Sequence, residues 1–158
     1  MKRLWDCMKR QVVSVLPTTT VQEAARIVVE KRVGTLPVVD AQGVLVGIVR
    51  LQDLLNVFMP DFVGLLERID FVHDFGALED LAPTEEVRTR RLTMADLMQP
   101  PVAVEEDCGL LRAFAIQMKR QTYDLPVVDA QGRLVGLASR VDVAAAFLAA
   151  WTGQECAA

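Results

Sequence analysis

A stretch of nineteen residues occurs twice in this chain. Residues 36–54 return 89 positions later as residues 125–143, with twelve of the nineteen positions identical, and both copies open with the letters LPVVDAQG. A segment that recurs once at so large a spacing is typical of a duplicated supersecondary unit rather than of a solenoid. The chain is therefore predicted to fold as two similar units, which bury faces that neither unit could bury alone.

Charge and hydropathy exclude two classes of partner. The chain of 158 residues has a formal net charge of −4, and its lysines and arginines are scattered. There is thus no basic surface to attract nucleic acid or anionic lipid headgroups. The sequence opens with charged residues, and its longest apolar run, residues 143–151, is far too short to span a bilayer. We therefore expect no nucleic-acid partner and no membrane insertion.

The cysteines indicate a reducing compartment. Cys7, Cys108 and Cys156 are odd in number and have no spacing typical of a zinc site. Free thiols explain them better than disulfides, and free thiols are typical of cytosolic proteins. The sequence therefore predicts a cytoplasmic protein without a bound metal.

The apolar content predicts contacts between subunits. Hydrophobic residues make up 52% of the chain, and the mean hydropathy is +0.27. A small protein has much surface for its volume, and most of that surface has to be kept free of large apolar patches. We therefore expect a homodimer that buries apolar helices, including residues 144–151. The alternative is a rich core in which this helix packs within one module.

In the first half, the pattern predicts a strand and a helix, then a hairpin and a second helix. Residues 11–15 are predicted to form a short strand, and residues 20–23 form a capping box that opens a helix with an apolar stripe. β-branched runs at residues 36–39 and 44–49 flank a turn that starts with Asp and ends with Gly, which predicts a hairpin. A helix is expected from Leu51 to about residue 58.

The second half follows the same order. It predicts strands at residues 102–104, 125–128 and 134–138, and helices at residues 109–120 and 140–151. The order of elements is thus β-α-β-β-α in both halves, and the predicted fold class is α/β (α+β).

A short lead-in precedes each half, Trp5-Asp-Cys-Met8 before the first and Ala95-Asp-Leu-Met98 before the second. Each half also carries the hairpin motif Pro-Val-Val-Asp-x-x-Gly-x-hydrophobic-Val-Gly and an Asp six residues after its last glycine. With these features each unit resembles a CBS domain, and two such units in one chain resemble a Bateman module. The resemblance implies two β-α-β-β-α repeats packed as a pseudo-two-fold pair, with a helical insert between them.

The expected division of the chain follows from this resemblance. It is CBS repeat 1 at residues 1–58, an acidic and aromatic insert at residues 59–92, CBS repeat 2 at residues 93–150 and a C-terminal tail at residues 151–158.

The insert has a pattern of its own. Residues 61–86 contain eight acidic residues and one basic residue, Arg68. The apolar residues Phe62, Leu65, Leu66 and Ile69 have helical spacing, which predicts an amphipathic helix. This helix is expected to pack on its own module or across a dimer, or to dock another protein. His73, the single histidine, is interpreted as a local hydrogen-bond partner of Asp74 rather than a catalyst.

A hydroxyl and a carboxylate, Ser139 and Asp142, lie three residues apart where the last strand meets the last helix. The unpaired backbone N–H groups at a helix N-terminus attract an anion. The Ser hydroxyl and these N–H groups suit a phosphate oxygen, and the Asp carboxylate suits the ribose hydroxyls of a nucleotide. The alternative is that the two residues only cap the helix.

The resemblance favours the binding function, because CBS pairs use this hydroxyl-x-x-Asp motif to bind adenosine-containing ligands in clefts between their repeats. It implies that Ser139 and Asp142 bind the ligand. It also implies contacts to the adenine from the first strand and from the segment around the Pro, which here are Val102, Val104, Tyr123, Asp124, Leu125 and Pro126.

The first repeat departs from the motif. Arg50 stands where the motif has a hydroxyl, while Asp53 is retained. Arg50 could bind a phosphate with its guanidinium, or it could fill an empty cleft and pair with an acid. We therefore expect one competent site, near Ser139 and Asp142. The resemblance implies that the adenine-contact positions of the first repeat are Val13, Gly34, Thr35 and Leu36.

Motifs of the common enzyme classes are missing: the sequence has no P-loop, no GxGxxG, no HExxH and no nucleophile elbow. The leading hypothesis is a non-catalytic regulatory module that binds AMP, ADP, ATP or S-adenosylmethionine without needing an obligatory cofactor. It would pass a conformational signal to itself or to an unidentified regulated protein. One alternative is a constitutive dimerisation or scaffold protein with empty clefts, and another is a hydrolase of the bound nucleotide.

Overall fold

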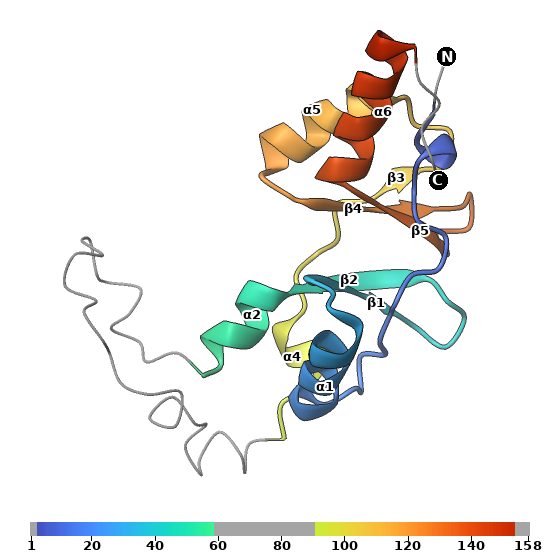
Figure 1. The fold of residues 1–158 in the computed structure, drawn as a ribbon. Helices are drawn as coiled ribbons and strands as arrows, with labels where there is room; N and C mark the ends of the chain where they lie inside the picture. Colours follow the sequence, from blue (N-terminus) through green and yellow to red (C-terminus); the bar gives the residue numbers. More distant parts are fainter. Residues whose placement is uncertain (1–2, 59–90, 154–158) are drawn as a thin grey trace, which may run out of the picture.

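The structure has two lobes, one for each repeat (Figure 1). It is a computed structural model, and it describes residues 3–58 and 91–153. In chain order the elements are η1 (Leu4–Asp6), α1 (Val21–Lys31), β1 (Thr35–Val39), β2 (Leu45–Arg50), α2 (Leu51–Asn56), α4 (Met94–Leu97), β3 (Val104–Glu105), α5 (Leu110–Arg120), β4 (Asp124–Val128), β5 (Leu134–Ser139) and α6 (Arg140–Thr152).

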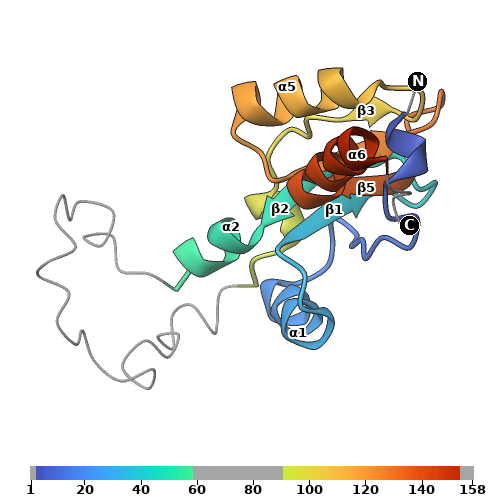
Figure 2. The same ribbon diagram turned by 45° about the horizontal axis from the view of Figure 1, so that its top comes forward.

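Each lobe is built on a small sheet with two helices packed on it (Figure 2). β1 pairs antiparallel with β2, and β4 pairs antiparallel with β5, while β3 lies parallel to β4. In repeat 1, a parallel bridge between Val15 and Val38 takes the place of the pairing between β3 and β4. The predicted α/β fold with β-α-β-β-α order in both repeats is thus confirmed. No helix in the described part of the chain is long and apolar enough to cross a bilayer.

Two predicted strands differ in extent from the observed ones. Residues 11–14 are not in a strand, because the chain reaches the edge of β1 only at Val15, which exchanges hydrogen bonds of 3.0 and 2.9 Å with the backbone of Pro37 and Val39. β3 starts at Val104 rather than at residue 102, since two prolines precede this segment and proline has no N–H to donate to a sheet. The valines at these positions therefore predicted more strand pairing than the structure has.

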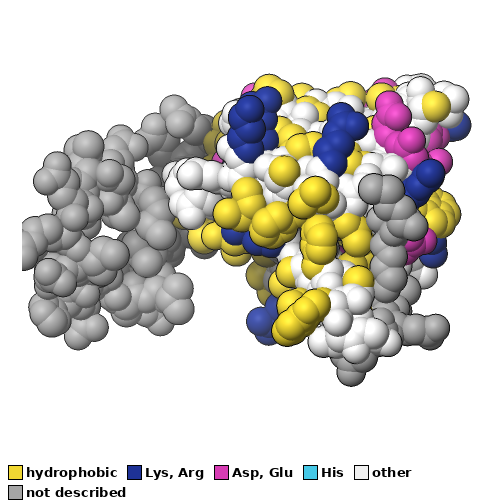
Figure 3. Space-filling model, turned by 90° about the horizontal axis from the view of Figure 1, so that it is seen from above, with side chains coloured by type: hydrophobic (Ala, Val, Ile, Leu, Met, Phe, Trp, Pro, Cys, Tyr) yellow, Lys and Arg dark blue, Asp and Glu magenta, His cyan; other side chains and the backbone are white. Residues whose placement is uncertain are grey.

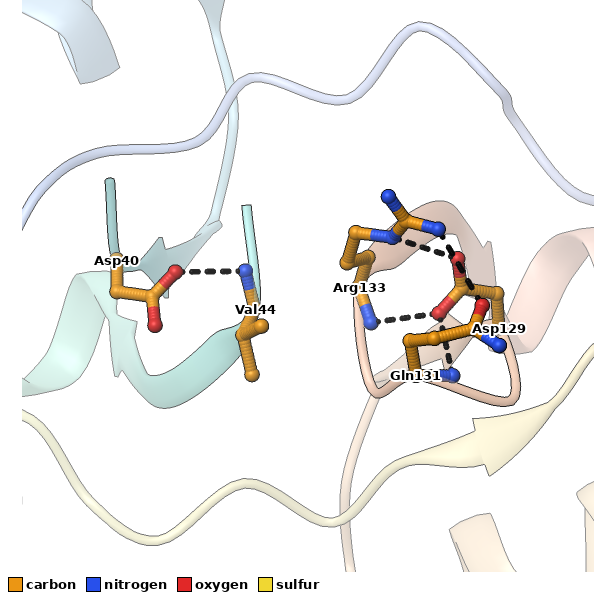
Figure 4. Close-up of polar contacts among 5 residues, drawn as sticks. All are labelled: Asp40, Val44, Asp129, Gln131 and Arg133. Carbon is orange, nitrogen blue, oxygen red and sulfur yellow. Dashed lines mark hydrogen bonds and ion pairs between the residues drawn. The ribbon is translucent and has the colours of Figure 1, made fainter. Parts of the chain in front are cut away.

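The two hairpin turns have the structure that their Asp and Gly predict (Figure 4). Oδ1 of Asp40 accepts the N–H of Val44 at 2.9 Å, and Oδ1 of Asp129 accepts the N–H of Arg133 at 2.8 Å. The glycine that closes each turn has a positive φ. The backbone hydrogen bond from Arg133 is also the main reason that the pKa of Asp129 lies below its ordinary value.

These turns join the two repeats. The N–H of Leu45 donates to the carbonyl of Gly132, and the N–H of Leu134 donates to the carbonyl of Gly43, both at 3.0 Å. The two bonds are equivalent under the duplication, because each residue of one pair has its counterpart 89 positions away in the other. The pseudo-two-fold axis therefore runs between the turns.

Each lead-in segment packs against the other repeat. Met8 of the first lead-in and Leu4, just before it, lie in the core of repeat 2. Met98 of the second lead-in packs against the core of repeat 1, and Met94, just before this lead-in, lies in that core. Neither repeat has a complete core without the lead-in of the other. Backbone hydrogen bonds of 2.9–3.0 Å attach the lead-ins, pairing Lys9 with Leu137 and Gln99 with Ile48.

The last glycine of each hairpin motif lies against a methionine of the exchanged lead-in. A Cβ at Gly47 would lie 2.5 Å from Sδ and 2.9 Å from Cβ of Met98, and a Cβ at Gly136 would collide with Sδ of Met8. Such distances are shorter than real Cβ contacts. The two glycines are therefore needed for the close approach of the lead-ins, and this explains why both copies of the motif carry them.

We expect Gly47→Ala to lower the free energy of unfolding by about 1–3 kcal/mol, because Met98 has to leave a packed position. Chemical denaturation of the purified protein measures the change. Gly34→Ala is the matched control, since nothing lies within 4 Å of the position that its Cβ would take. The control should stay within about 0.5 kcal/mol of the parent protein. Equal stabilities for the two variants would contradict this explanation of Gly47.

Candidate ligand site

The site predicted in repeat 2 lies at the junction of β5 and α6. Ser139 is the N-cap of α6, and its Oγ accepts the N–H of Asp142 at 3.1 Å. Oδ2 of Asp142 accepts the N–H of Ser139 at 2.8 Å and its hydroxyl at 2.6 Å. The two residues thus form a capping box, as expected if they cap the helix. Oδ1 of Asp142 makes no hydrogen bond within the described residues, so it is left to accept one from a ligand.

The start of β4 forms the other edge of this site. Asp124 is the register partner of Ser139, and the carbonyl of Tyr123 accepts the N–H of Arg140 at 2.6 Å. The side chain of Tyr123 is 71% exposed. The fold therefore brings four of the predicted site residues, Ser139, Asp142, Tyr123 and Asp124, to one junction.

The apolar residues predicted for this site are placed differently. Leu125 and Pro126 are fully buried, Val104 is buried, and Val102 packs against the same core. Their side chains belong to the core of repeat 2, and of the four only Leu125 and Pro126 lie on β4, the strand that begins with Asp124. Contacts of these four residues with a ligand stay a prediction.

One hydrogen bond connects the candidate sites of the two repeats. Oγ1 of Thr35, at the start of β1, donates to Oδ2 of Asp124, at the start of β4, at 2.5 Å. The two residues are 89 positions apart and so occupy equivalent places in the duplication. Thr35 is buried. The starts of β1 and β4 are therefore in direct contact through this hydrogen bond.

The site of repeat 1 has the same backbone arrangement with different side chains. Thr35 is the register partner of Arg50, whose N–H donates to Oδ2 of Asp53 at 2.8 Å. The Arg50 side chain is exposed, and its guanidinium forms no ion pair or hydrogen bond within the described residues. Leu36 is fully buried in the core of repeat 1, and Val13 packs against that core.

Sequence reasoning missed two polar residues behind the site of repeat 2. Gln117 on α5 is fully buried and donates from Nε2 to the carbonyl of Ala138 at 3.2 Å. Nη2 of Arg140 donates to the carbonyl of Thr122 at 3.1 Å. A position-by-position comparison of the two halves could have found them, because the equivalent residues of repeat 1 are the apolar Val28 and Leu51.

The described part of the chain offers little for metal binding or for nucleophilic catalysis by a cysteine. No group of three or more His, Cys, Asp or Glu residues there could hold a metal ion. Burial raises the pKa of the Cys108 thiol, which makes it a poor nucleophile. A cleft of about 300 Å³ lies at the first lead-in, away from the junction, and is lined by Arg3, Trp5, Asp6, Glu106 and Asp107.

Some predictions fall outside the described residues. These are the insert helix, His73 and Cys156. The proposed boundaries of the insert stay a prediction for the same reason.

Comparisons with known proteins agree with this architecture. The model of the CBS domain family matches residues 4–60 and 94–149. A curated relative, the chloroplastic CBS domain-containing protein CBSX1 of Arabidopsis thaliana, is 37% identical over 141 residues, which are 85% of this chain and 58% of CBSX1. The chain thus spans about three fifths of the length of this relative.

Solved structures have the same fold. The crystal structure of CBSX2 in complex with AMP is 31% identical and has a TM-score of 0.72, covering 96% of this chain and 99% of that one. The cytosolic domain of the Mg²⁺ channel MgtE in complex with ATP is 26% identical, with a TM-score of 0.62 over 87% of this chain and 46% of that one. Both the sequence match and the shared fold cover the two repeats. The chain belongs to the CBS domain family and carries a pair of CBS domains.

Proposed function

We propose that this protein is a regulatory module that binds an adenosine-containing nucleotide at the junction of β5 and α6 in repeat 2. The observation that carries the proposal is the geometry of this junction. The N-terminus of α6 lies there with the hydroxyl of Ser139 and the carboxylate of Asp142. Oδ1 of that carboxylate has no partner in the described chain. The crystal structure of CBSX2 is a complex with AMP, and the likeness covers nearly all of that crystallised chain, which supports the choice of ligand.

The chemistry of binding follows from the groups present. The N–H groups of the first turn of α6 and the hydroxyl of Ser139 attract a phosphate oxygen. The carboxylate of Asp142 accepts hydrogen bonds from the ribose hydroxyls through Oδ1, while Oδ2 keeps the helix cap. The site thus uses one residue for stability and for binding, and neither use excludes the other.

The role is regulatory rather than catalytic. The residues at the junction can bind and orient a nucleotide. The carboxylate oxygen of Asp142 that accepts the Ser139 hydroxyl also accepts the N–H of Ser139, and both hydrogen bonds serve the helix cap. Ligand binding at Asp124 is transmitted to repeat 1 through the hydrogen bond from Thr35. The cytoplasmic location stays a prediction, because the relative CBSX1 is chloroplastic.

We expect AMP to raise the melting temperature, since a ligand at 100 times its dissociation constant adds about 2.7 kcal/mol of stability. ADP, ATP and S-adenosylmethionine are tested in the same assay.

Asp142→Ala should weaken AMP binding about ten- to a hundredfold, because a charged hydrogen-bond acceptor is lost. Isothermal titration calorimetry measures this affinity.

Asp96→Ala is the matched control for the loss of a helix cap. Asp96 accepts the N–H and the hydroxyl of Thr93 at 2.8 and 2.9 Å, as Asp142 does from Ser139, but it lies on α4. The control should lose stability and keep its affinity for AMP. A wild-type protein whose melting temperature none of the four ligands moves would favour the scaffold hypothesis instead.

The number of sites depends on Arg50. If its exposed guanidinium binds phosphate, ATP should occupy two sites per chain and adenosine at most one, because adenosine offers no charge to a guanidinium. Calorimetric titration gives both stoichiometries, and Arg50→Leu should reduce the value for ATP to one. One site for every ligand in the parent protein would show that Arg50 does not bind phosphate.

We also propose that the protein is a homodimer, through the outer face of α5 and α6. Leu148 is 59% and Trp151 85% exposed, and Leu111 on α5 is exposed as well. Seen from above, hydrophobic side chains gather across this part of the molecule (Figure 3). Val143 and Ala146, on the opposite side of α6, are buried in the module. The helix thus contributes to the core with one face and leaves the other to a second subunit.

Light scattering at micromolar concentration is expected to give the mass of a dimer. Leu148→Glu combined with Trp151→Glu should give a folded monomer, because both side chains are outside the core and a charge in an apolar interface is costly. Phe147 is a less clear test, since its ring packs edge-to-face on Phe114 with centroids 6.2 Å apart.

Leu16→Glu is the matched control, because Leu16 is also an exposed leucine but lies in the loop before α1. It should remain a dimer. A monomeric parent protein would refute the proposed interface.

A further inference from the structure

A polar network lies behind the candidate site of repeat 2. Gln117 is fully buried on α5, and its Nε2 donates to the carbonyls of Ala138 at 3.2 Å and Tyr123 at 3.4 Å. Ala138 directly precedes Ser139 on β5, and Tyr123 directly precedes Asp124 on β4. One side chain therefore ties together the two backbone segments that carry the polar groups of the site.

Arg140 holds the same segment from the other side. Its Nη2 donates to the carbonyls of Thr122 at 3.1 Å and Gln117 at 3.5 Å. Its guanidinium also stacks on the ring of Tyr123, with Cζ 4.5 Å from the ring centroid. Together with the backbone bond from Arg140 to the carbonyl of Tyr123, these contacts fix the turn before β4 in one place.

Repeat 1 forms the same fold without this network. Its equivalent residues are Val28 and Leu51, and the turn before β1 is held by the corresponding backbone bond, from the N–H of Leu51 to the carbonyl of Gly34 at 2.8 Å. The backbone arrangement is therefore stable with apolar side chains at both positions. The fold itself does not require a glutamine and an arginine there.

The network also lowers the stability of the fold locally. Oε1 of Gln117 and Nε of Arg140 are buried and have no hydrogen-bond partner within the described residues. Buried polar atoms without partners destabilise a protein, and the apolar pair found in repeat 1 avoids them. A local cost of this kind that the fold can do without is typical of residues kept for function.

We propose that Gln117 and Arg140 are positioning residues for the ligand site of repeat 2. They hold Tyr123 and Asp124 against the Ser139 junction, so that both edges of the site are in place before a nucleotide arrives. Ordering a segment at the moment of binding weakens affinity, and a preformed edge avoids that loss. This inference rests on the proposed function, and it explains why the network accompanies the hydroxyl-x-x-Asp motif in repeat 2 and is missing where Arg50 replaces the hydroxyl.

The test separates positioning from stability with a near-isosteric variant. Gln117→Met keeps the volume of the side chain, and it removes both the unpartnered Oε1 and the two hydrogen bonds that Nε2 donates to the carbonyls of Ala138 and Tyr123. We expect its melting temperature to be equal to that of the parent or higher, and its affinity for AMP in calorimetry to fall about tenfold. Val28→Met introduces the same side chain at the equivalent position of repeat 1 and should keep the parent affinity. A residue with a merely structural role would give a lower melting temperature with unchanged affinity, and that result overturns the proposal.

Arg140 is tested with two variants. Arg140→Leu takes the residue type of repeat 1, and Arg140→Lys keeps the charge but loses the planar guanidinium that reaches two carbonyls and stacks on Tyr123. We expect both to weaken AMP binding about tenfold. Full affinity in Arg140→Lys would show that Arg140 acts by charge attraction alone, which overturns its positioning role.

A ligand-free measurement distinguishes failure of this inference from failure of the proposed function. Hydrogen exchange of the amides of residues 122–124 should speed up at least tenfold in Gln117→Met and Arg140→Leu, with unchanged exchange in the middle of α5. If the parent protein binds none of the nucleotides, the proposed function fails while this readout still judges the positioning. Unchanged exchange in both variants overturns the positioning role whether or not AMP binds.

Discussion

The exchange of lead-in segments is the interaction on which the rest of this structure depends. Each repeat has a small sheet and two helices, too little to bury a stable core alone. Met8 and Met98 fill that gap by packing across the axis, and Gly136 and Gly47 leave the room for them. The exchange brings the two hairpins together along the pseudo-two-fold axis. It thereby places the start of β1 beside the start of β4, where Thr35 reaches across.

The two repeats have the same backbone fold but different side chains at their strand-to-helix junctions. The hairpin motif is nearly the same in both repeats because its glycines, valines and turn aspartates are constrained by close packing and by local hydrogen bonds. The residues around the strand-to-helix junction are not constrained in this way. Repeat 1 has Arg50 and Val28 where repeat 2 has Ser139 and Gln117. The two halves could therefore diverge in what they bind without any change in how they fold.

The junction in repeat 2 combines a structural and a binding role in the same groups. Ser139 and Asp142 satisfy the N-terminus of α6, which any helix needs, and the remaining carboxylate oxygen faces no protein partner in the described chain. A helix cap and a nucleotide site differ in what surrounds them. In this protein the difference lies in the turn before β4, which Gln117 and Arg140 hold beside the cap.

Features that depend on neighbouring residues could be predicted from the sequence alone. The order of elements, the capping box at Thr20 and the Asp-x-x-Gly turns follow from local spacing, and the structure confirms them. The duplication is read directly from the repeated letters. The hydroxyl-x-x-Asp motif was also visible. Three other features could not be predicted, because each joins residues that are distant in the chain. They are the exchange of lead-ins, the bond between Thr35 and Asp124 and the contacts of Gln117. Only the tertiary structure decides such contacts, since spacing along the sequence carries no record of which distant groups packing will bring together.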